Sequence, residues 1–328
     1  MTLKESKKEK TNIDYILYLK FKSSIGNFDF KGRFQKILYA ISGNSVEILY
    51  QFSKKDCSPG NIGEFEEIQK IKGVGTFLDI LSLSTEIMTS CDYDGYNFKV
   101  DKELRKEFYN NKDLNLRTFL PKLPPNLNHL SYDAFPAVID ESSRDTHNPD
   151  TIELFRYLLE CFEKYDFKDS KILSLLNYWR KGLLLEHFGF YEESFLNFYK
   201  IIEYFTGRNS FSLSMTDDEK INILNEVFVR KFGINHNEGL AKIILEIMEI
   251  RNNWDVAHSK IKKTNNIENR NLFFNITVHD NIWQYNDFIK EISRFFILRH
   301  LNFTNLQLIN DGGLFHLDFA EKNNDNLS

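Results

Sequence analysis

The amino-acid sequence predicts an α+β protein, in which a mixed α/β domain precedes an all-α helical bundle. Short alternating runs with β-branched and aromatic residues occur in the first 145 residues, whereas helical spacing of apolar residues begins after Pro149. A stretch that is rich in proline separates the two parts, and 328 residues suffice for two domains. We therefore predict domains at residues 1–148 and 149–328, and expect a sensory or regulatory role for the first.

The first domain is expected to contain both strands and helices. Strands are predicted at Tyr15–Phe21 and Ser45–Phe52, because apolar and aromatic residues alternate there and turn residues such as Gly26-Asn27 follow. Helices are predicted at Phe34–Ile41 and Thr76–Met88. These elements together indicate a mixed α/β domain.

The second domain is expected to be helical throughout. Thr216 and Glu219 have the spacing of a capping box, in which each side chain satisfies a backbone amide at the start of a helix. Residues 265–278 are predicted to form an irregular or extended connection. The predicted helices lie at 151–165, 170–188, 191–206, 216–231, 237–258 and 283–301.

Charge and cysteine content exclude several classes of protein. Lys and Arg total 42 against 47 Asp and Glu, so the net charge of −5 argues against coating of nucleic acid by bulk charge. The chain has 3 cysteines and no C-x-x-C pair, which predicts a reduced, cytoplasmic protein without a disulfide framework. Its histidines lack metal-ligand spacing, no complete phosphate-binding glycine motif occurs, and charges interrupt the longest apolar stretch, 172–190. We therefore expect no metal, no cofactor and no membrane span.

The helix predicted at 237–258 carries one stripe of residues that begins apolar and ends in an arginine and a histidine. Burying such polar groups on an apolar stripe costs free energy unless they face a cleft or the seam of a dimer. A functional cleft is one interpretation, and a buried hydrogen-bond network between helices of a non-catalytic bundle is the other. The stripe consists of Leu240, Ile244, Ile247, Arg251, Trp254 and His258.

Two segments resemble the HEPN family. The segment from Arg251 to His258 resembles the family's signature, an arginine usually followed by a polar residue and then, after four to six positions, a histidine; six residues intervene here. The segment from Tyr191 to Phe205 resembles an earlier HEPN helix with aromatic and apolar residues and a glutamate. The resemblance covers about residues 150–310.

This resemblance implies a metal-independent endoribonuclease that acts as a homodimer and serves phage defence or a toxin-like stress response. In such a site His258 would move protons, Arg251 would bind the phosphate, and Asn252 would hold the phosphate or orient a neighbour. The 2′-hydroxyl of the RNA would be the nucleophile, and the catalytic site would draw on both subunits.

Residues around this motif have both functional and structural interpretations. Lys260, Lys262 and Lys263 can guide the phosphate backbone, or they can simply complement the helix dipole. Asp255 lies four residues after Arg251 and can pair with it. Glu203 on the preceding helix is a candidate second partner of Arg251, or part of an ordinary salt bridge.

Two alternatives stay open from the sequence. The chain can be a non-catalytic HEPN module that assembles a larger defence complex. Lys260 occupies the position where some HEPN toxins carry a tyrosine that an antitoxin nucleotidyltransferase modifies, so that form of control is not supported. Another antitoxin partner remains compatible with the sequence.

Overall fold

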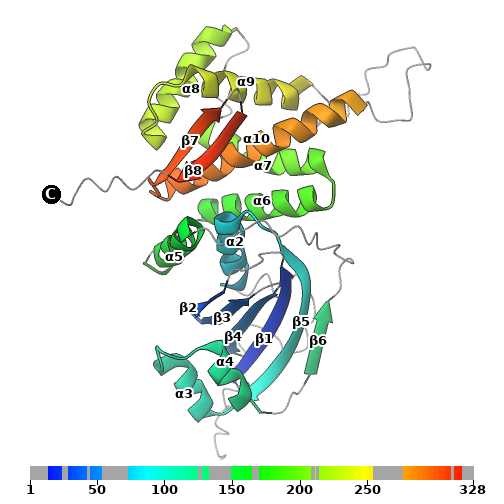
Figure 1. The fold of residues 1–328 in the computed structure, drawn as a ribbon, viewed down its shortest axis with the longest axis vertical. Coiled ribbons are helices and arrows are strands. Elements are labelled where there is room, and N and C mark those ends of the chain that lie inside the picture. The colour runs from blue at the N-terminus through cyan, green and yellow to red at the C-terminus, as the bar shows by residue number, and fades with distance from the viewer. Residues whose placement is uncertain are drawn as a thin grey trace, which may run out of the picture. The chain divides into compact units, whose positions relative to one another are not determined.

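The computed structural model describes residues 14–23, 29–42, 45–53, 73–124, 128–132, 149–164, 170–207, 211, 214–253, 276–311 and 314–319. The chain divides into two compact units, Met1–Asp166 and Phe167–Ser328. An antiparallel sheet dominates the first unit, and helices dominate the second (Figure 1). The predicted α+β class is confirmed.

The first unit is built on an antiparallel sheet in which six strands of the described chain pair in the order β2-β3-β4-β1-β5-β6. Tyr15–Phe21 and Ser45–Phe52, the two predicted strands, lie within β1 and β4, which pair so that Tyr18 lies opposite Leu49. The strands are β1 (Asp14–Ser23), β2 (Phe30–Phe34), β3 (Ile37–Ser42), β4 (Ser45–Ser53), β5 (Thr89–Val100) and β6 (Asn128–Tyr132).

Helices of the first unit cover both faces of this sheet. Successive residues of a strand point to opposite faces. Tyr39 of β3 contacts the rings of Phe77 and Phe155 on one face, while its neighbour Leu38 belongs to a buried cluster with Phe108 on the other. The helices are α2 (Val74–Thr85), α3 (Lys102–Asn110), α4 (Leu116–Phe119), the short 3₁₀ helix η1 (Leu120–Lys122) and α5 (Pro149–Lys164).

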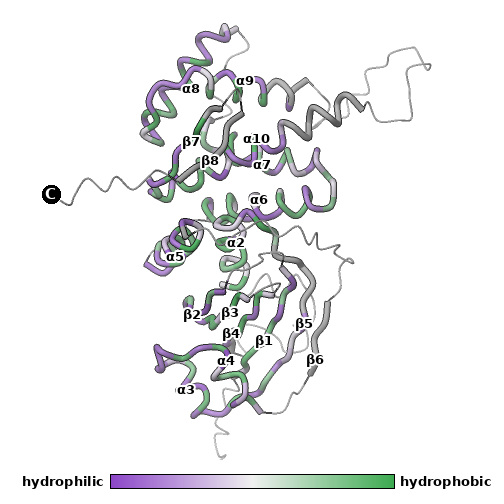
Figure 2. The backbone as a smooth tube through the Cα atoms, in the orientation of Figure 1, coloured by the Kyte–Doolittle hydropathy of each residue, from purple (hydrophilic) through white to green (hydrophobic). Residues whose placement is uncertain are grey.

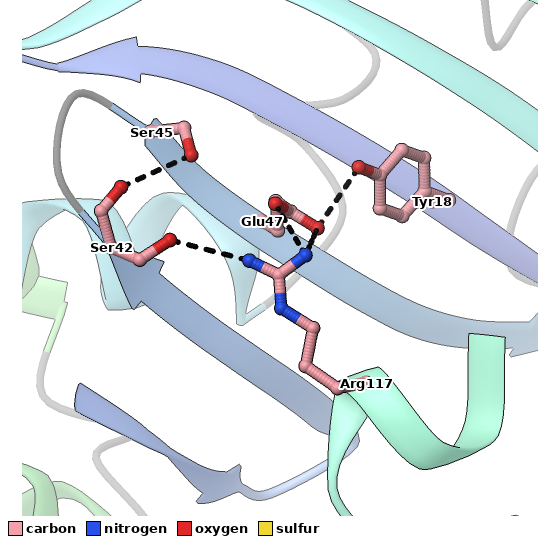
Figure 3. A network of polar contacts seen from close by, with 5 residues as sticks. All are labelled: Tyr18, Ser42, Ser45, Glu47 and Arg117. Carbon is pink, nitrogen blue, oxygen red and sulfur yellow. Dashed lines mark hydrogen bonds and ion pairs between the residues drawn. The ribbon is translucent and has the colours of Figure 1, made fainter. Parts of the chain in front are cut away.

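A polar network joins α4 to the sheet (Figure 3). Glu47 of β4 is buried, and its carboxylate accepts a hydrogen bond from the hydroxyl of Tyr18 over 3.1 Å. Arg117 lies 3.1 Å from the same carboxylate and donates to Ser42 over 3.2 Å. Burial and the nearby charge of Glu47 both raise the pKa of Tyr18. The carboxylate is therefore buried with a donor on each side, as a buried charge requires.

The second unit is a helical assembly that ends in a β-hairpin. Aromatic rings from three helices meet in its core, where Phe232 stacks on Phe296 at 4.4 Å and Phe205 contacts both rings edge-on. Hydrophilic and hydrophobic residues follow one another along α8, as expected of a surface helix (Figure 2). The elements are α6 (Ser170–His187), α7 (Tyr191–Thr206), α8 (Asp217–Phe232), α9 (Glu238–Asn253), α10 (Ile276–His300), β7 (Leu306–Asp311) and β8 (Leu314–Phe319).

Most predicted helices are confirmed, including those at 76–88, 151–165, 170–188, 191–206, 216–231 and 283–301. The capping box is also confirmed, because the Thr216 side chain accepts from the backbone amide of Glu219, and the Glu219 carboxylate accepts from that of Thr216. Helix α9 confirms the described part of the helix predicted at 237–258. An irregular connection was predicted at 265–278. Residues 265–275 lie outside the described residues, and residues 276–278 belong to α10, which begins at Ile276.

The helix predicted at Phe34–Ile41 is wrong. Phe34 ends β2, Gln35 adopts a left-handed φ of 50°, and Ile37 begins β3, so the segment turns back on itself as a hairpin. Apolar residues at 34, 37, 38 and 41 have helical spacing by coincidence. Strand β3 is buried on both faces, and a strand of that kind has no alternating pattern by which to recognise it.

Two further expectations about domain layout need correction. The second unit is not all-α, because β7 and β8 form a hairpin in which Asp311 lies opposite Leu314. The division between units lies after Asp166 rather than after residue 148. Helix α5 belongs to the first unit, since Phe155 packs edge-on against Phe77 of α2. Among the helices that the structure describes, none is both long and apolar enough to cross a membrane.

Candidate functional site

Helix α7 forms the floor of the candidate site. Its buried face consists of large apolar residues at helical spacing, among them Phe195, Phe198 and Ile202, none of which is exposed to solvent. The rings of Phe195 and Tyr199 are stacked, with their centroids 6.4 Å apart and their planes within 11°. Tyr199 is itself only 5% exposed, so packing holds its ring in place.

Helix α9 brings the arginine of the motif to this floor. Asn237 precedes the helix, and its side-chain oxygen accepts a hydrogen bond from the amide of Leu240 over 3.0 Å, which satisfies a donor of the first turn. Asn225 of α8 anchors the same position, because its side-chain oxygen accepts from the amide of Asn237 over 2.9 Å. Leu240, Ile244 and Ile247 are then completely buried along one face of α9. Arg251 continues that face in the last turn.

The guanidinium of Arg251 lies over the ring of Tyr199. Its central carbon is 5.6 Å from the ring centroid, within the range of a cation–π contact. Arg251 is only partly exposed, whereas the residues that precede it on the stripe are buried. The stripe therefore changes from apolar packing to a positioned cation where α9 meets α7.

Neighbouring helices hold α7 from two other sides. Ser194 donates a side-chain hydrogen bond to the carbonyl oxygen of Gly182 on α6, over 2.8 Å. Ser293 of α10 donates to the carbonyl oxygen of Phe198 over 3.0 Å. Both donors are fully buried, so these bonds fix the relative positions of three helices. The floor of the candidate site is therefore rigidly supported.

A buried lysine adds a charged link between α6 and α10. Lys290 lies 2.9 Å from a carboxylate oxygen of Glu186 and 3.0 Å from one of Asp287. Burial disfavours the charged form of Lys290, but the two carboxylates outweigh burial and raise its pKa above the ordinary value. Lys290 is therefore a charged structural group.

The structure describes only part of the predicted site. Arg251 lies at the end of α9, Asn252 follows it within the same helix, and Glu203 lies on α7. Glu203 comes four residues after Tyr199, so both lie on one face of α7. Trp254, Asp255, His258, Lys260, Lys262 and Lys263 lie outside the described residues.

The sequence analysis did not connect Tyr199 with Arg251. The tertiary structure buries Tyr199 and places its ring against the guanidinium. The signal that the sequence offered was an aromatic residue within Tyr191–Phe205, the segment that resembles an earlier HEPN helix. Within the described ranges, no three His, Cys, Asp or Glu side chains gather as a set of metal ligands.

The arrangement suits recognition of an anion. A guanidinium that lies on an aromatic face presents its N–H donors in its own plane, in a fork that matches the oxygens of a phosphate. Comparison of the chain with protein-family models, with curated proteins and with solved structures found no match.

Proposed function

We propose that the chain is a metal-independent endoribonuclease of the HEPN type, which acts as a homodimer in the cytoplasm. The observation that carries this proposal is the position of Arg251, which ends the buried stripe of α9 and lies against α7. Helix α7 is one of the two segments whose sequences resemble the family, and Arg251, which contacts it, is the first residue of the other. Arg251 is partly exposed, and a guanidinium that reaches solvent can bind the oxygens of a phosphate.

The proposed reaction needs proton transfer and charge stabilisation. The 2′-hydroxyl oxygen of RNA attacks the adjacent phosphorus, and His258 accepts the hydroxyl proton, because imidazole titrates near neutral pH. The bond from phosphorus to the 5′-oxygen breaks, and a second imidazolium protonates that oxygen. The products are a 2′,3′-cyclic phosphate and a 5′-hydroxyl. Arg251 stabilises the negative charge that develops on the phosphate oxygens.

The other residues of the motif have supporting roles in this proposal. Asn252 holds the phosphate or orients a neighbour, and Lys260, Lys262 and Lys263 attract the RNA backbone. Asp255 and Glu203 pair with Arg251 and so orient its guanidinium. A homodimer supplies two histidines to one groove, so that one serves as base and the other as acid.

The experiment is RNA cleavage by the purified full-length chain in the presence of EDTA. We expect cleavage to survive chelation and to disappear in both Arg251→Ala and His258→Ala, with 2′,3′-cyclic phosphate ends identified by mass spectrometry. Lys242→Ala is the matched control, because Lys242 is an exposed cation on α9 that pairs with Glu238 over 2.7 Å. RNA that stays intact with wild-type protein, or cleavage that persists in both variants, contradicts the proposal.

A non-catalytic HEPN scaffold is the second candidate. The contact between Arg251 and Tyr199 favours it, because an arginine that packs on a buried ring can serve structure alone. In that case Arg251→Ala would lower the stability of the protein and leave RNA intact under all conditions. Isolation of a stable complex with a defence protein, unaffected by His258→Ala, would then identify the scaffold.

We further propose that the ribonuclease serves phage defence or a toxin-like stress response, under restraint by the first unit or by an antitoxin protein. Unrestrained RNA cleavage would harm the host, and the chain has a separate unit that can supply the restraint. Leu38→Ala removes a fully buried side chain from the core of the first unit. We expect this variant to arrest growth of an expressing strain more strongly than wild type, and His258→Ala to abolish that effect. Equal growth of the two strains would exclude restraint by the first unit.

A further inference from the structure

We propose that Tyr199 is a positioning residue for Arg251, and that its ring sets the orientation in which the guanidinium meets the phosphate. The inference deepens the proposed ribonuclease function and rests on it for its catalytic meaning. The contact itself is a physical claim about two residues, and it can be tested without any RNA. Neither the sequence pattern nor the family resemblance assigns Tyr199 this role.

The ring of Tyr199 is well suited to hold a cation. It is 5% exposed and stacked on Phe195, so it loses little further freedom when the guanidinium lies on it. A cation–π contact is stronger when water is excluded from it. Arg251 is in the last turn of its helix, and its long side chain has several rotatable bonds. The ring therefore selects among those orientations.

This selection affects the transition state more than it affects RNA binding. An arginine that is free to move still attracts the phosphate backbone by charge, but its two parallel N–H donors are aligned with the phosphate oxygens for less of the time. Loss of the ring should therefore lower kcat while changing KM little. A purely structural role of Tyr199 would lower the fraction of folded protein and leave kcat per folded molecule unchanged.

The residue that precedes Tyr199 offers a matched control. Phe198 is an aromatic residue of the same helix and is fully buried, but its ring contacts Trp179 of α6 at 5.2 Å instead of Arg251. Phe198→Leu and Tyr199→Leu each remove one ring from α7. Only the second removes the ring over which the Arg251 guanidinium lies.

The first experiment is a double-mutant cycle on thermal unfolding of the full-length chain, with Tyr199→Leu and Arg251→Ala alone and combined. We expect the shifts in unfolding midpoint to be non-additive, because either change alone already removes the contact. The cycle that pairs Phe198→Leu with Arg251→Ala should be additive. An additive Tyr199 cycle overturns the inference. Should Tyr199→Leu fail to fold, the cycle with Tyr199→Met decides in its place.

The second experiment measures RNA cleavage per folded molecule. We expect Tyr199→Leu to lower kcat about 10-fold with little change in KM, and Tyr199→Phe, which keeps the ring, to stay within about 2-fold of wild type. Wild-type kcat in Tyr199→Leu overturns the inference. If the wild-type protein cleaves no RNA at all, the proposed function fails, while the double-mutant cycle still decides whether Tyr199 positions Arg251.

Discussion

Lys290 of α10 donates a hydrogen bond to Glu186 of α6 across 2.9 Å, although its side chain is only 8% exposed. The two residues are 104 positions apart in the sequence. A second carboxylate, that of Asp287, lies 3.0 Å from the same nitrogen. The pair therefore joins two helices of the second unit through a charge that is largely removed from water.

Replacement of Lys290 by methionine should destabilise the protein by about 2–4 kcal/mol, because it leaves Glu186 without its cation in a poorly hydrated position. The double variant Lys290→Met with Glu186→Leu should recover much of this loss, since neither charge then remains. Urea denaturation measures both. Lys242→Met, which removes an exposed lysine from α9, is the control and should be neutral. A neutral Lys290→Met would mean that the link contributes nothing.

Stability should fall as the pH rises above about 10, the ordinary pKa of tyrosine. The folded state raises the pKa of Tyr18, chiefly by burial and then through the charge of Glu47. The unfolded chain therefore loses this proton first, and the stabilisation present below the unfolded pKa is lost toward the folded pKa. The raised pKa of Lys290 acts in the same direction.

Tyr18→Phe should make this alkaline loss of stability shallower, because the group that loses its proton is gone. At neutral pH the variant should cost about 1 kcal/mol for the lost hydrogen bond to Glu47. Urea denaturation at several pH values from about 8 to about 11, on either side of the ordinary tyrosine pKa, compares the unfolding free energies of Tyr18→Phe and wild type. Parallel slopes for Tyr18→Phe and wild type would contradict it.

Gly182→Ala should destabilise the contact between α6 and α7 by about 1–3 kcal/mol. An added methyl group would lie 2.5 Å from a ring carbon of Phe198, whose ring is fully buried and cannot move aside. Lys181→Ala, at the exposed position next to it, is the matched control. The double variant Gly182→Ala with Phe198→Leu should lose less than the sum of the two single changes. An additive result in thermal unfolding would show that the helices adjust around the methyl group.

Mixing of inactive subunits tests the composite site. If one active site needs one arginine and one histidine from either chain, heterodimers of Arg251→Ala and His258→Ala should regain RNA cleavage. If the site needs both pairs, an inactive subunit should suppress the activity of its wild-type partner. Activity that merely dilutes in proportion, with a monomeric mass by light scattering, would contradict the proposed homodimer.

Several local features follow from the sequence alone because their causes are local. The capping box of Thr216 and Glu219 depends on two residues three positions apart, and it starts α8 where predicted. The apolar spacing of Leu240, Ile244 and Ile247 predicted one buried face of α9, and all three are fully buried. The hairpin of β7 and β8 was not predicted, although the Gly312-Gly313 pair between two runs with apolar residues is a local signal for a turn.

Only the tertiary structure decided which elements meet. Phe34, Ile37 and Ile41 have the spacing of a helix. The segment instead forms strand β3, which pairs with neighbouring strands and whose side chains are buried on both faces of the sheet. Helix α5 belongs to the first unit because the ring of Phe155 packs against that of Phe77, and the periodicity of the sequence does not reveal this contact. By itself the sequence determined that the apolar stripe of α9 leads to Arg251. That this arginine lies on Tyr199 was decided by packing, because a helical pattern specifies which face is buried but not the partner that covers it.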